Sequence, residues 1–163
     1  MQVLPKPKVY LETTIPSYLA ARSSRDIVIA AHQQLTRDWW ETRRTEFDLY
    51  ISELVLREAR SGNHAAATLR LDVLAEVPLL AVNDEIVELA EDLVVHGPLH
   101  RNAAADAAHI AFAAVYGCDY LLTWNCRHIA NAELQRSIRQ VVERHGYDVP
   151  NLCTPEELMG EES

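Results

Sequence analysis

Short apolar segments of strand length alternate with helical patterns along this chain, and this alternation restricts the possible folds more than any other feature. The expected strands cover 8–12, 47–52, 79–82 and 119–123, with a last extended segment at 147–152. The expected helices cover 26–44, 54–59, 65–75, 85–96, 103–116 and 129–145. Apolar strands separated by helices are typical of a parallel sheet that is covered on both faces. The sequence therefore predicts an α/β protein with a three-layer α/β/α arrangement.

The chain has the length and composition of one globular domain. It has 163 residues, of which 48% are hydrophobic and 24% are charged. A chain of this size buries roughly two-thirds of its unfolded surface, so it needs no disulfide or metal to hold its core together. Because we find no repeat, linker or low-complexity segment, we expect residues 1–163 to form a single domain.

The N-terminus and the cysteines predict a cytoplasmic protein. The opening segment MQVLPKPKVY has no apolar stretch of signal-peptide length, and no other segment approaches a membrane span. Cys118, Cys126 and Cys153 are an odd number at irregular spacing, as expected for ordinary thiols in a reducing compartment. A zinc site that uses Cys118, Cys126 and His128 is the less favoured alternative, because the sequence lacks a paired C-x-x-C.

The net charge limits how the protein can bind nucleic acid. The formal charge is −9 and the sequence pI is near 5.2. Proteins that bind nucleic acid by broad neutralisation of phosphates usually carry the opposite sign. The charge counts against that class, and it leaves open a nucleic-acid enzyme with a local basic rim, a metal in its site or a basic partner segment.

Four polar residues follow the predicted strands or begin the helices after them. Glu12 ends the first strand, Glu58 lies on the helix after the second strand, Asp106 is one turn into a helix, and Asn125 follows the strand at 119–123. Ligands of parallel sheets bind beyond the carboxyl ends of the strands. We therefore expect these residues to gather at one edge of the sheet. The simpler alternative for Glu12 is that it only marks the point where a buried strand reaches solvent.

Other enzyme classes lack their motifs here. The sequence contains no G-x-S-x-G elbow and neither of the glycine-rich phosphate-binding loops, and it has only five glycines. Nucleotide-dependent enzymes and serine hydrolases of the nucleophile-elbow type are therefore not expected.

Four segments in succession resemble the motifs of PIN domains, in particular those of the VapC-type toxins of bacterial toxin–antitoxin pairs. These segments are VYLETTIPSYL, LYISELVLREA, ADAAHIAFA and DYLLTWNCRHIAN, and together they span nearly the whole chain. The resemblance implies a metal-dependent endoribonuclease that acts on structured RNA, a cognate antitoxin as partner, and a homodimer. The alternative is a PIN-like binding module whose catalytic activity has weakened.

The resemblance also assigns the site residues. The acids of the family fall on Glu12, Glu58 and Asp106, and the fourth acidic position is Asn125, whereas Glu53 is a neighbour outside the site. Two positions depart from the family pattern, because the first acid is usually aspartate and the fourth position here is uncharged. The three acids are the expected ligands of Mg²⁺ or Mn²⁺, which prefer oxygen donors and activate water for attack on a phosphodiester. Without a cation, three clustered carboxylates would repel one another.

Several neighbours are candidates for binding the RNA substrate. Thr13 is expected to orient Glu12 or bind a phosphate oxygen, with closure of the turn before Pro16 as the alternative. Trp124 is expected to stack on a base, and Arg127 and Arg101 to meet phosphates, although surface arginines are usually only solvated.

Two further expectations concern residues outside these motifs. His109 shares a helix face with Asp106, but a histidine on an apolar helix is more often a core residue. The dimer is expected to use Trp39, Trp40, Phe47 and the apolar faces of the helices at 26–44 and 65–75.

Overall fold

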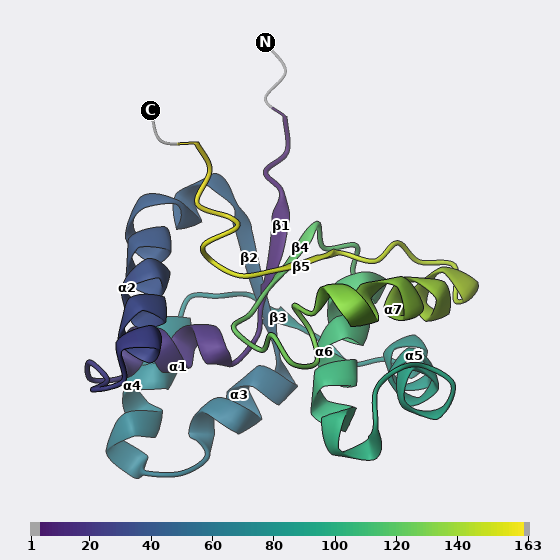
Figure 1. Ribbon diagram of the computed structural model, residues 1–163, viewed down its shortest axis with the longest axis horizontal. Helices are drawn as coiled ribbons and strands as arrows, with labels where there is room; N and C mark the ends of the chain where they lie inside the picture. The colour runs from purple at the N-terminus through teal and green to yellow at the C-terminus, as the bar shows by residue number, and fades with distance from the viewer. Residues whose placement is uncertain (1–3, 162–163) are drawn as a thin grey trace.

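The computed structural model describes residues 4–161 and confirms the three-layer α/β/α fold (Figure 1). The ends of the predicted domain, residues 1–3 and 162–163, and with them the first residues of the N-terminal segment, lie outside the described residues. Five strands pair in parallel in the order β3-β2-β1-β4-β5. They are β1 (Lys8–Leu11), β2 (Asp48–Ser52), β3 (Leu79–Leu80), β4 (Tyr120–Leu122) and β5 (Asn151–Cys153).

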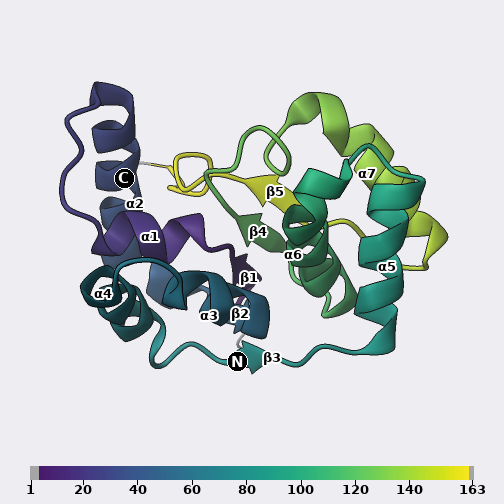
Figure 2. The same cartoon turned by 90° about the horizontal axis from the view of Figure 1, so that it is seen from below.

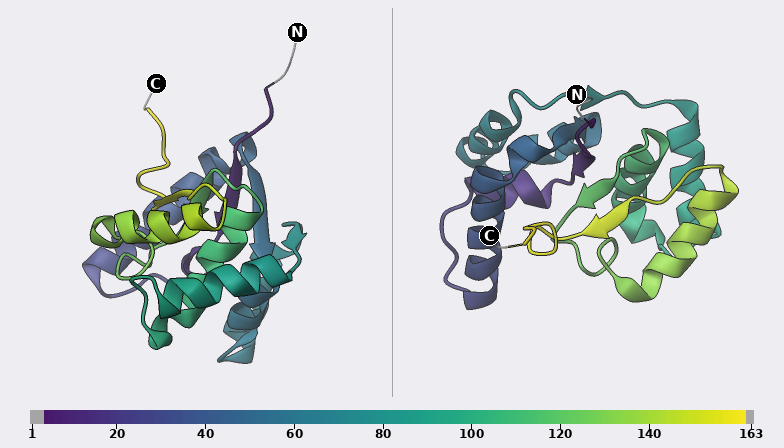
Figure 3. Two further views of the ribbon diagram at one scale, coloured as in Figure 1. Left: turned by 90° about the vertical axis from the view of Figure 1, so that its right-hand side faces the viewer. Right: turned by 90° about the horizontal axis from the view of Figure 1, so that it is seen from above.

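Two groups of helices cover the sheet. Helices α1 (Thr14–Ala20), α2 (Ile27–Thr42) and α4 (His64–Leu74) lie on one side, and α3 (Glu53–Arg60) continues directly from β2 (Figure 1). Helices α5 (Asp84–Val95), α6 (Ala104–Val115) and α7 (Ala132–Arg144) lie on the other side (Figure 3). Short 3-10 turns, η1 (Arg44–Glu46) and η2 (Arg101–Ala103), precede β2 and α6. Among residues 4–161, no helix has both the length and the apolar character that crossing a membrane requires.

Side-chain caps set the start of most helices. Asp26 accepts hydrogen bonds from the first turn of α2, and Asn83 does so for α5, as their positions in the sequence predict. Asn102 instead lies within η2, and the cap residue of α6 is Ala103, which makes no side-chain cap. Helix α6 ends at Val115, and Gly117, whose φ is +67°, turns the chain toward β4.

The core is built around β1, the central strand. Val9, Tyr10 and Leu11 are completely buried, and the alanine-rich face of α6 packs in the same core. After β1 the chain moves outward through β2 and β3 and then returns to the opposite side of β1 for β4 and β5. Ligands of such sheets bind beyond the carboxyl ends of the strands at the point of this reversal, which here is the region past β1 and β4, and we call this region the crevice. Figure 2 shows the molecule from the side on which these strands end.

One helix was not expected from the sequence. Residues 14–20 form α1, whereas the sequence analysis placed only a turn before Pro16. Pro16 is the third residue of α1, where a backbone N–H has no partner inside the helix, so proline is tolerated there. The predicted helix at 129–145 begins later, at Ala132, because the Asn125 carbonyl accepts hydrogen bonds from Ile129 and Ala130 and holds them in a loop.

Candidate active site

Glu12 is a buried carboxylate that is held through one oxygen. Only 5% of its surface is exposed. Its Oε1 accepts hydrogen bonds from the Thr14 amide (3.1 Å), the Thr14 hydroxyl (2.5 Å) and the Thr123 hydroxyl (2.6 Å). Within residues 4–161 its Oε2 accepts none. Because Glu12 is buried and bonded, the alternative that it only marks the exit of a strand to solvent is wrong.

The same threonines tie the ends of β1 and β4 together. The Thr14 hydroxyl accepts a hydrogen bond from the Trp124 amide (2.8 Å), and the Thr123 hydroxyl accepts one from the Asn125 amide (2.9 Å). Each hydroxyl therefore donates to Glu12 and accepts from the loop after β4. This arrangement fixes Glu12 at the floor of the crevice.

Glu58 reaches the crevice from α3, and it too is held through Oε1. The Thr13 hydroxyl and the His109 Nε2 both lie 2.6 Å from this oxygen. Burial acts to raise the pKa of Glu58, but the hydrogen bonds from His109 and Thr13, together with the charge of Arg57, leave the pKa lowered. Glu53 is exposed on the first turn of α3, whereas Glu58 is part-buried and bonded to Thr13 and His109.

Asp106 is bonded through both of its oxygens. Its Oδ1 accepts from the Asn125 Nδ2 (2.8 Å), and its Oδ2 lies 3.0 Å from the His128 Nδ1. The Asn125 Oδ1 accepts from the His128 amide (3.0 Å), so the amino end of the Asn125 side chain faces the acid. Asn125 is therefore a hydrogen-bond donor to Asp106 in this arrangement.

The three carboxylates are of the chemical type that binds a divalent cation, but they do not point to one common position. Glu12, Glu58 and Asp106 supply the carboxylate oxygens that Mg²⁺ and Mn²⁺ prefer. Across residues 4–161, however, no three His, Cys, Asp or Glu side chains surround a common point at metal-binding range. Protein donors occupy both oxygens of Asp106, whereas Oε2 of each glutamate accepts no hydrogen bond in the same part of the chain. A cation would have to displace Asn125 or His128 to reach Asp106.

The structure places the predicted substrate residues in different environments. Thr13 contacts Glu58, while Arg101 and Arg127 are exposed on η2 and on the loop after β4. Trp124 is only 9% exposed, its ring stacks on His32 at 4.0 Å, and its Nε1 donates to Thr36. Trp124 is thus a packing residue, in contrast to the prediction that it stacks on a base.

Three site residues were missed by the sequence analysis. Thr123 anchors Glu12, and Tyr10 and Ser52 form a buried hydrogen-bond chain with His109. Ser52 has a detectable signal, because serine between a strand and a helix is a typical N-cap. The tyrosine gives no such signal, since tyrosine is common in strands.

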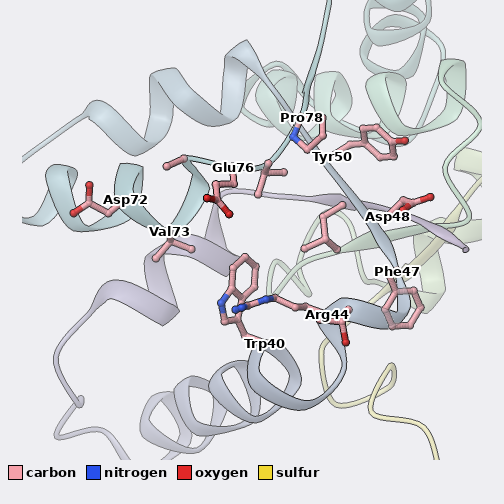
Figure 4. A pocket seen from close by; sticks show the side chains of 13 residues that line it. Trp40, Arg44, Phe47, Asp48, Tyr50, Asp72, Val73, Glu76 and Pro78 are labelled. Carbon is pink, nitrogen blue, oxygen red and sulfur yellow. The ribbon is translucent and has the colours of Figure 1, made fainter.

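The residues that the sequence predicts at the dimer surface are not all exposed in the structure. Trp39 and Phe47 are core residues, with 0% and 8% exposure, so they cannot contact a partner. Trp40 is half-buried with the Arg44 guanidinium 4.8 Å above its ring, and both line a cavity of about 600 Å³ (Figure 4). This cavity lies beside the first residues of β2, whereas the acids lie past the carboxyl ends of the strands.

The cysteines suggested for a zinc site lie in different environments. Cys118 is buried and Cys126 is exposed. Burial raises the pKa of the Cys118 thiol to about 11 and that of Cys153 to about 12, which keeps both protonated at neutral pH.

Comparison with solved structures identifies the fold. Mycobacterium tuberculosis VapC20, a toxin that cleaves the sarcin–ricin loop, aligns with a TM-score of 0.58 and 16% identity over 74% of this chain and 92% of that chain. A chain of Rickettsia felis VapBC2, solved bound to a DNA fragment from its promoter, aligns with a TM-score of 0.54 and 18% identity over 80% of this chain and 92% of that chain. No family model and no curated protein sequence matches. The protein therefore has the PIN-domain fold of the VapC toxins.

Proposed function

We propose that this protein is a metal-dependent endoribonuclease that hydrolyses structured RNA, as the toxin of a toxin–antitoxin pair. The observation that supports the proposal is that side-chain hydrogen bonds hold each of the three acids: Glu12 by Thr14 and Thr123, Glu58 by Thr13 and His109, and Asp106 by Asn125 and His128. Both glutamates are fixed through Oε1, and Oε2 of each accepts no hydrogen bond within residues 4–161. Such an oxygen can bind a cation, a water molecule or a ligand that is itself bound to a phosphate.

The residues of the chain have distinct roles in this reaction. A bound Mg²⁺ or Mn²⁺ would supply charge stabilisation for the phosphate and lower the pKa of the attacking water. Glu12, Glu58 and Asp106 would hold the cation, and Asn125 would orient Asp106. Arg101 and Arg127, both exposed, would meet the RNA backbone. In hydrolysis the water oxygen bonds to phosphorus, the bond from phosphorus to the leaving oxygen breaks, and a proton passes to that leaving oxygen.

A specific observation favours a second candidate, a PIN-like binding module with weakened catalysis. The Asn125 side-chain amide donates a hydrogen bond to Asp106, so this acid has a partner without a cation. In residues 4–161 the three carboxylates also do not surround a common point. A module of this kind would bind RNA or protein without cleaving RNA.

The proposed partner is an antitoxin that brings arginine or lysine to the carboxylates. A basic side chain would pair with the acids and take the place of the cation. Mg²⁺ should then weaken antitoxin binding, and insensitivity to Mg²⁺ would argue against this mode. We place the protein in the cytoplasm, where its RNA substrate would be.

We also propose a two-fold homodimer, with a surface revised from the sequence prediction. Large apolar side chains are exposed at the start of α2 and on α4, namely Ile27, Val28, Ile29 and Leu69. Exposed apolar side chains on monomers are usually isolated, so three in succession favour a contact surface. Light scattering at micromolar concentration should give twice the monomer mass, and a monomer mass would refute the proposal.

The test separates the two candidate functions by metal binding and cleavage together. Calorimetric titration with Mg²⁺ and Mn²⁺ should give one site in the wild type and weaker binding by at least about 100-fold in Asp106→Ala. Wild type should cleave structured RNA only with the metal, and a chelator should stop cleavage. Wild type that binds RNA but does not cleave it even with saturating Mg²⁺ or Mn²⁺ would instead support the binding module.

A further inference from the structure

A row of buried hydrogen bonds connects the start of α3 to Glu58 through the core. The Ser52 hydroxyl lies 2.7 Å from the Tyr10 hydroxyl, which lies 2.7 Å from the His109 Nδ1. The opposite ring nitrogen, Nε2, lies 2.6 Å from the Glu58 Oε1. Tyr10 and Ser52 are fully buried and His109 is 1% exposed, so water does not compete for these bonds.

The two ends of this row determine its direction. The Val55 amide can only donate, and it donates to the Ser52 oxygen at the N-terminus of α3 (3.4 Å). An ionised Glu58 can only accept, so the His109 Nε2 must carry the hydrogen. The His109 Nδ1 then accepts from Tyr10, and the Tyr10 oxygen accepts from Ser52. In this order every hydroxyl and ring nitrogen has a partner.

The other arrangements leave a conflict. A hydrogen on Nδ1 alone would place the bare Nε2 against the Glu58 carboxylate, which is two acceptors in contact. A ring with hydrogens on both nitrogens would reverse the hydroxyl bonds and leave the Ser52 O–H without an acceptor among the described residues. Buried polar groups without partners are costly, so the directed row is the stable arrangement.

We propose that His109 is a positioning residue for the nuclease site: Tyr10 and Ser52 lock its ring with the hydrogen on Nε2, and the ring fixes Oε1 of Glu58 so that Oε2 remains free for the ligand. The inference rests on the proposed function for its catalytic consequence only. Thr13 supplies the second bond to the same oxygen, so two donors from two elements set the orientation of the carboxylate. The ring itself gains or loses no proton in this role.

The first test reads the ring directly and needs no RNA. Nitrogen-15 NMR of the histidine side chains should show His109 with its hydrogen on Nε2 and a bare Nδ1. Tyr10→Phe removes the donor to Nδ1 while keeping the aromatic ring, and Glu58 still holds the hydrogen on Nε2, so the Nδ1 signal should shift toward that of a bare nitrogen without a hydrogen bond. Tyr116→Phe is the matched control, because it removes a hydroxyl that donates to the Ala81 carbonyl at the far end of α6. A hydrogen on Nδ1 in the wild type, or an unchanged spectrum in Tyr10→Phe, would overturn the proposal.

The second test measures the catalytic consequence. Partners behind a ligating side chain typically contribute about 10- to 100-fold to activity. We therefore expect kcat to fall about 10-fold in Tyr10→Phe and about 100-fold in His109→Leu, with KM for RNA changed less than about twofold. His109→Gln keeps a side-chain N–H donor and should recover part of the loss, and Tyr116→Phe should leave kcat unchanged.

The outcomes distinguish this inference from the function on which it rests. If the wild type does not cleave RNA, the proposed function fails, and the NMR measurement still decides whether the ring is locked. If the wild type cleaves RNA and Tyr10→Phe shifts the Nδ1 signal with no loss of kcat, the row is purely structural and the positioning role is refuted. If His109→Leu does not fold, as its melting curve will show, Tyr10→Phe and His109→Gln carry the test.

Discussion

The carboxylate crevice and the cavity of Figure 4 each contain three acids, but they hold them in opposite ways. In the crevice, Glu12, Glu58 and Asp106 are each hydrogen-bonded by side chains from other elements. In the cavity, Asp48, Asp72 and Glu76 are exposed, and within residues 4–161 their carboxylates accept no side-chain or backbone hydrogen bond (Figure 4). In the described part of the chain, the cavity has acids without protein partners, and the crevice has acids that protein donors hold in place.

This difference makes the hydrogen-bonded acids of the crevice better candidates for a catalytic site than the exposed acids that line the cavity. Fixing a carboxylate in advance avoids reorganisation when a charged ligand arrives. Exposed acids beside open solvent are already satisfied by water and impose no geometry. We therefore propose that the chemistry takes place in the crevice and not in the cavity.

The largest expected effect comes from removing one anchored charge. Glu58→Gln should reduce metal-dependent RNA cleavage by at least about 100-fold, because a direct ligand contributes at least as much as the partners behind it. Glu53→Gln, on the exposed first turn of the same helix, should change the rate less than about twofold. Initial cleavage rates of both variants with a structured RNA provide the comparison.

A second control comes from the cavity itself. Asp72→Asn removes an acid that is not anchored, and it should leave cleavage unchanged. If Asp72→Asn or Glu53→Gln abolishes cleavage while Glu58→Gln does not, the assignment of the chemistry to the crevice is wrong.

Much of the fold was predictable because it depends on local patterns. The strand at 8–12 and the helix at 85–96 were predicted within one residue at each end, since apolar runs and cap residues mark them. Helix α1 was missed because Pro16 reads as a turn signal, and only the helix register places it where its missing N–H does no harm. Its position matters, since Thr13 and Thr14 precede and begin this helix.

The sequence suggests where the candidate site residues lie along the strands and helices, but it does not give their hydrogen-bond partners. The positions of Glu12, Glu58, Asp106 and Asn125 follow from the order of strands and helices. Which donor meets which oxygen depends on contacts between residues about 40 to 110 positions apart, such as Thr123 with Glu12. A linear pattern contains no such information. For the same reason the burial of Trp124 beneath His32 could not be anticipated.

The next largest effect is the salt dependence of RNA binding. It tests the contrast between the negative net charge of the protein and the few exposed cations near the crevice. Arg101 and Arg127 are the exposed cations that we expect to touch RNA near the crevice. Two contacts predict a shallow slope of about −1.4 for log affinity against log salt with single-stranded RNA, or about a sevenfold loss between roughly 50 and 200 mM. Filter binding across this range measures the slope. A steep slope combined with metal-independent binding would require a broad basic face and would contradict the proposed mode.

The smallest expected effect comes from a fourth anchored acid, which tests whether anchoring alone is sufficient. Asp92 on α5 accepts hydrogen bonds from His96 and His145, each at 2.7 Å, so both of its oxygens are paired away from the crevice. The hydrogen bond from His145 is the largest cause that lowers the pKa of Asp92 below its ordinary value. This contact should contribute to stability and not to RNA cleavage.

The pH dependence of that contribution has a definite sign. A carboxyl group with a lowered folded-state pKa stabilises the protein fully above its unfolded pKa of about 3.9, and the stabilisation is lost as the pH falls through the lower folded value. Asp92→Asn should therefore lower the free energy of unfolding by about 0.5–1 kcal/mol at neutral pH, as for a partly exposed ion pair. The difference between wild type and variant should shrink below pH of about 4. Urea unfolding at a series of pH values measures it, and cleavage rates should be equal. A loss of cleavage in Asp92→Asn would show that the α5–α7 contact and the crevice are coupled, and the distinction between the two kinds of anchored acid would fail.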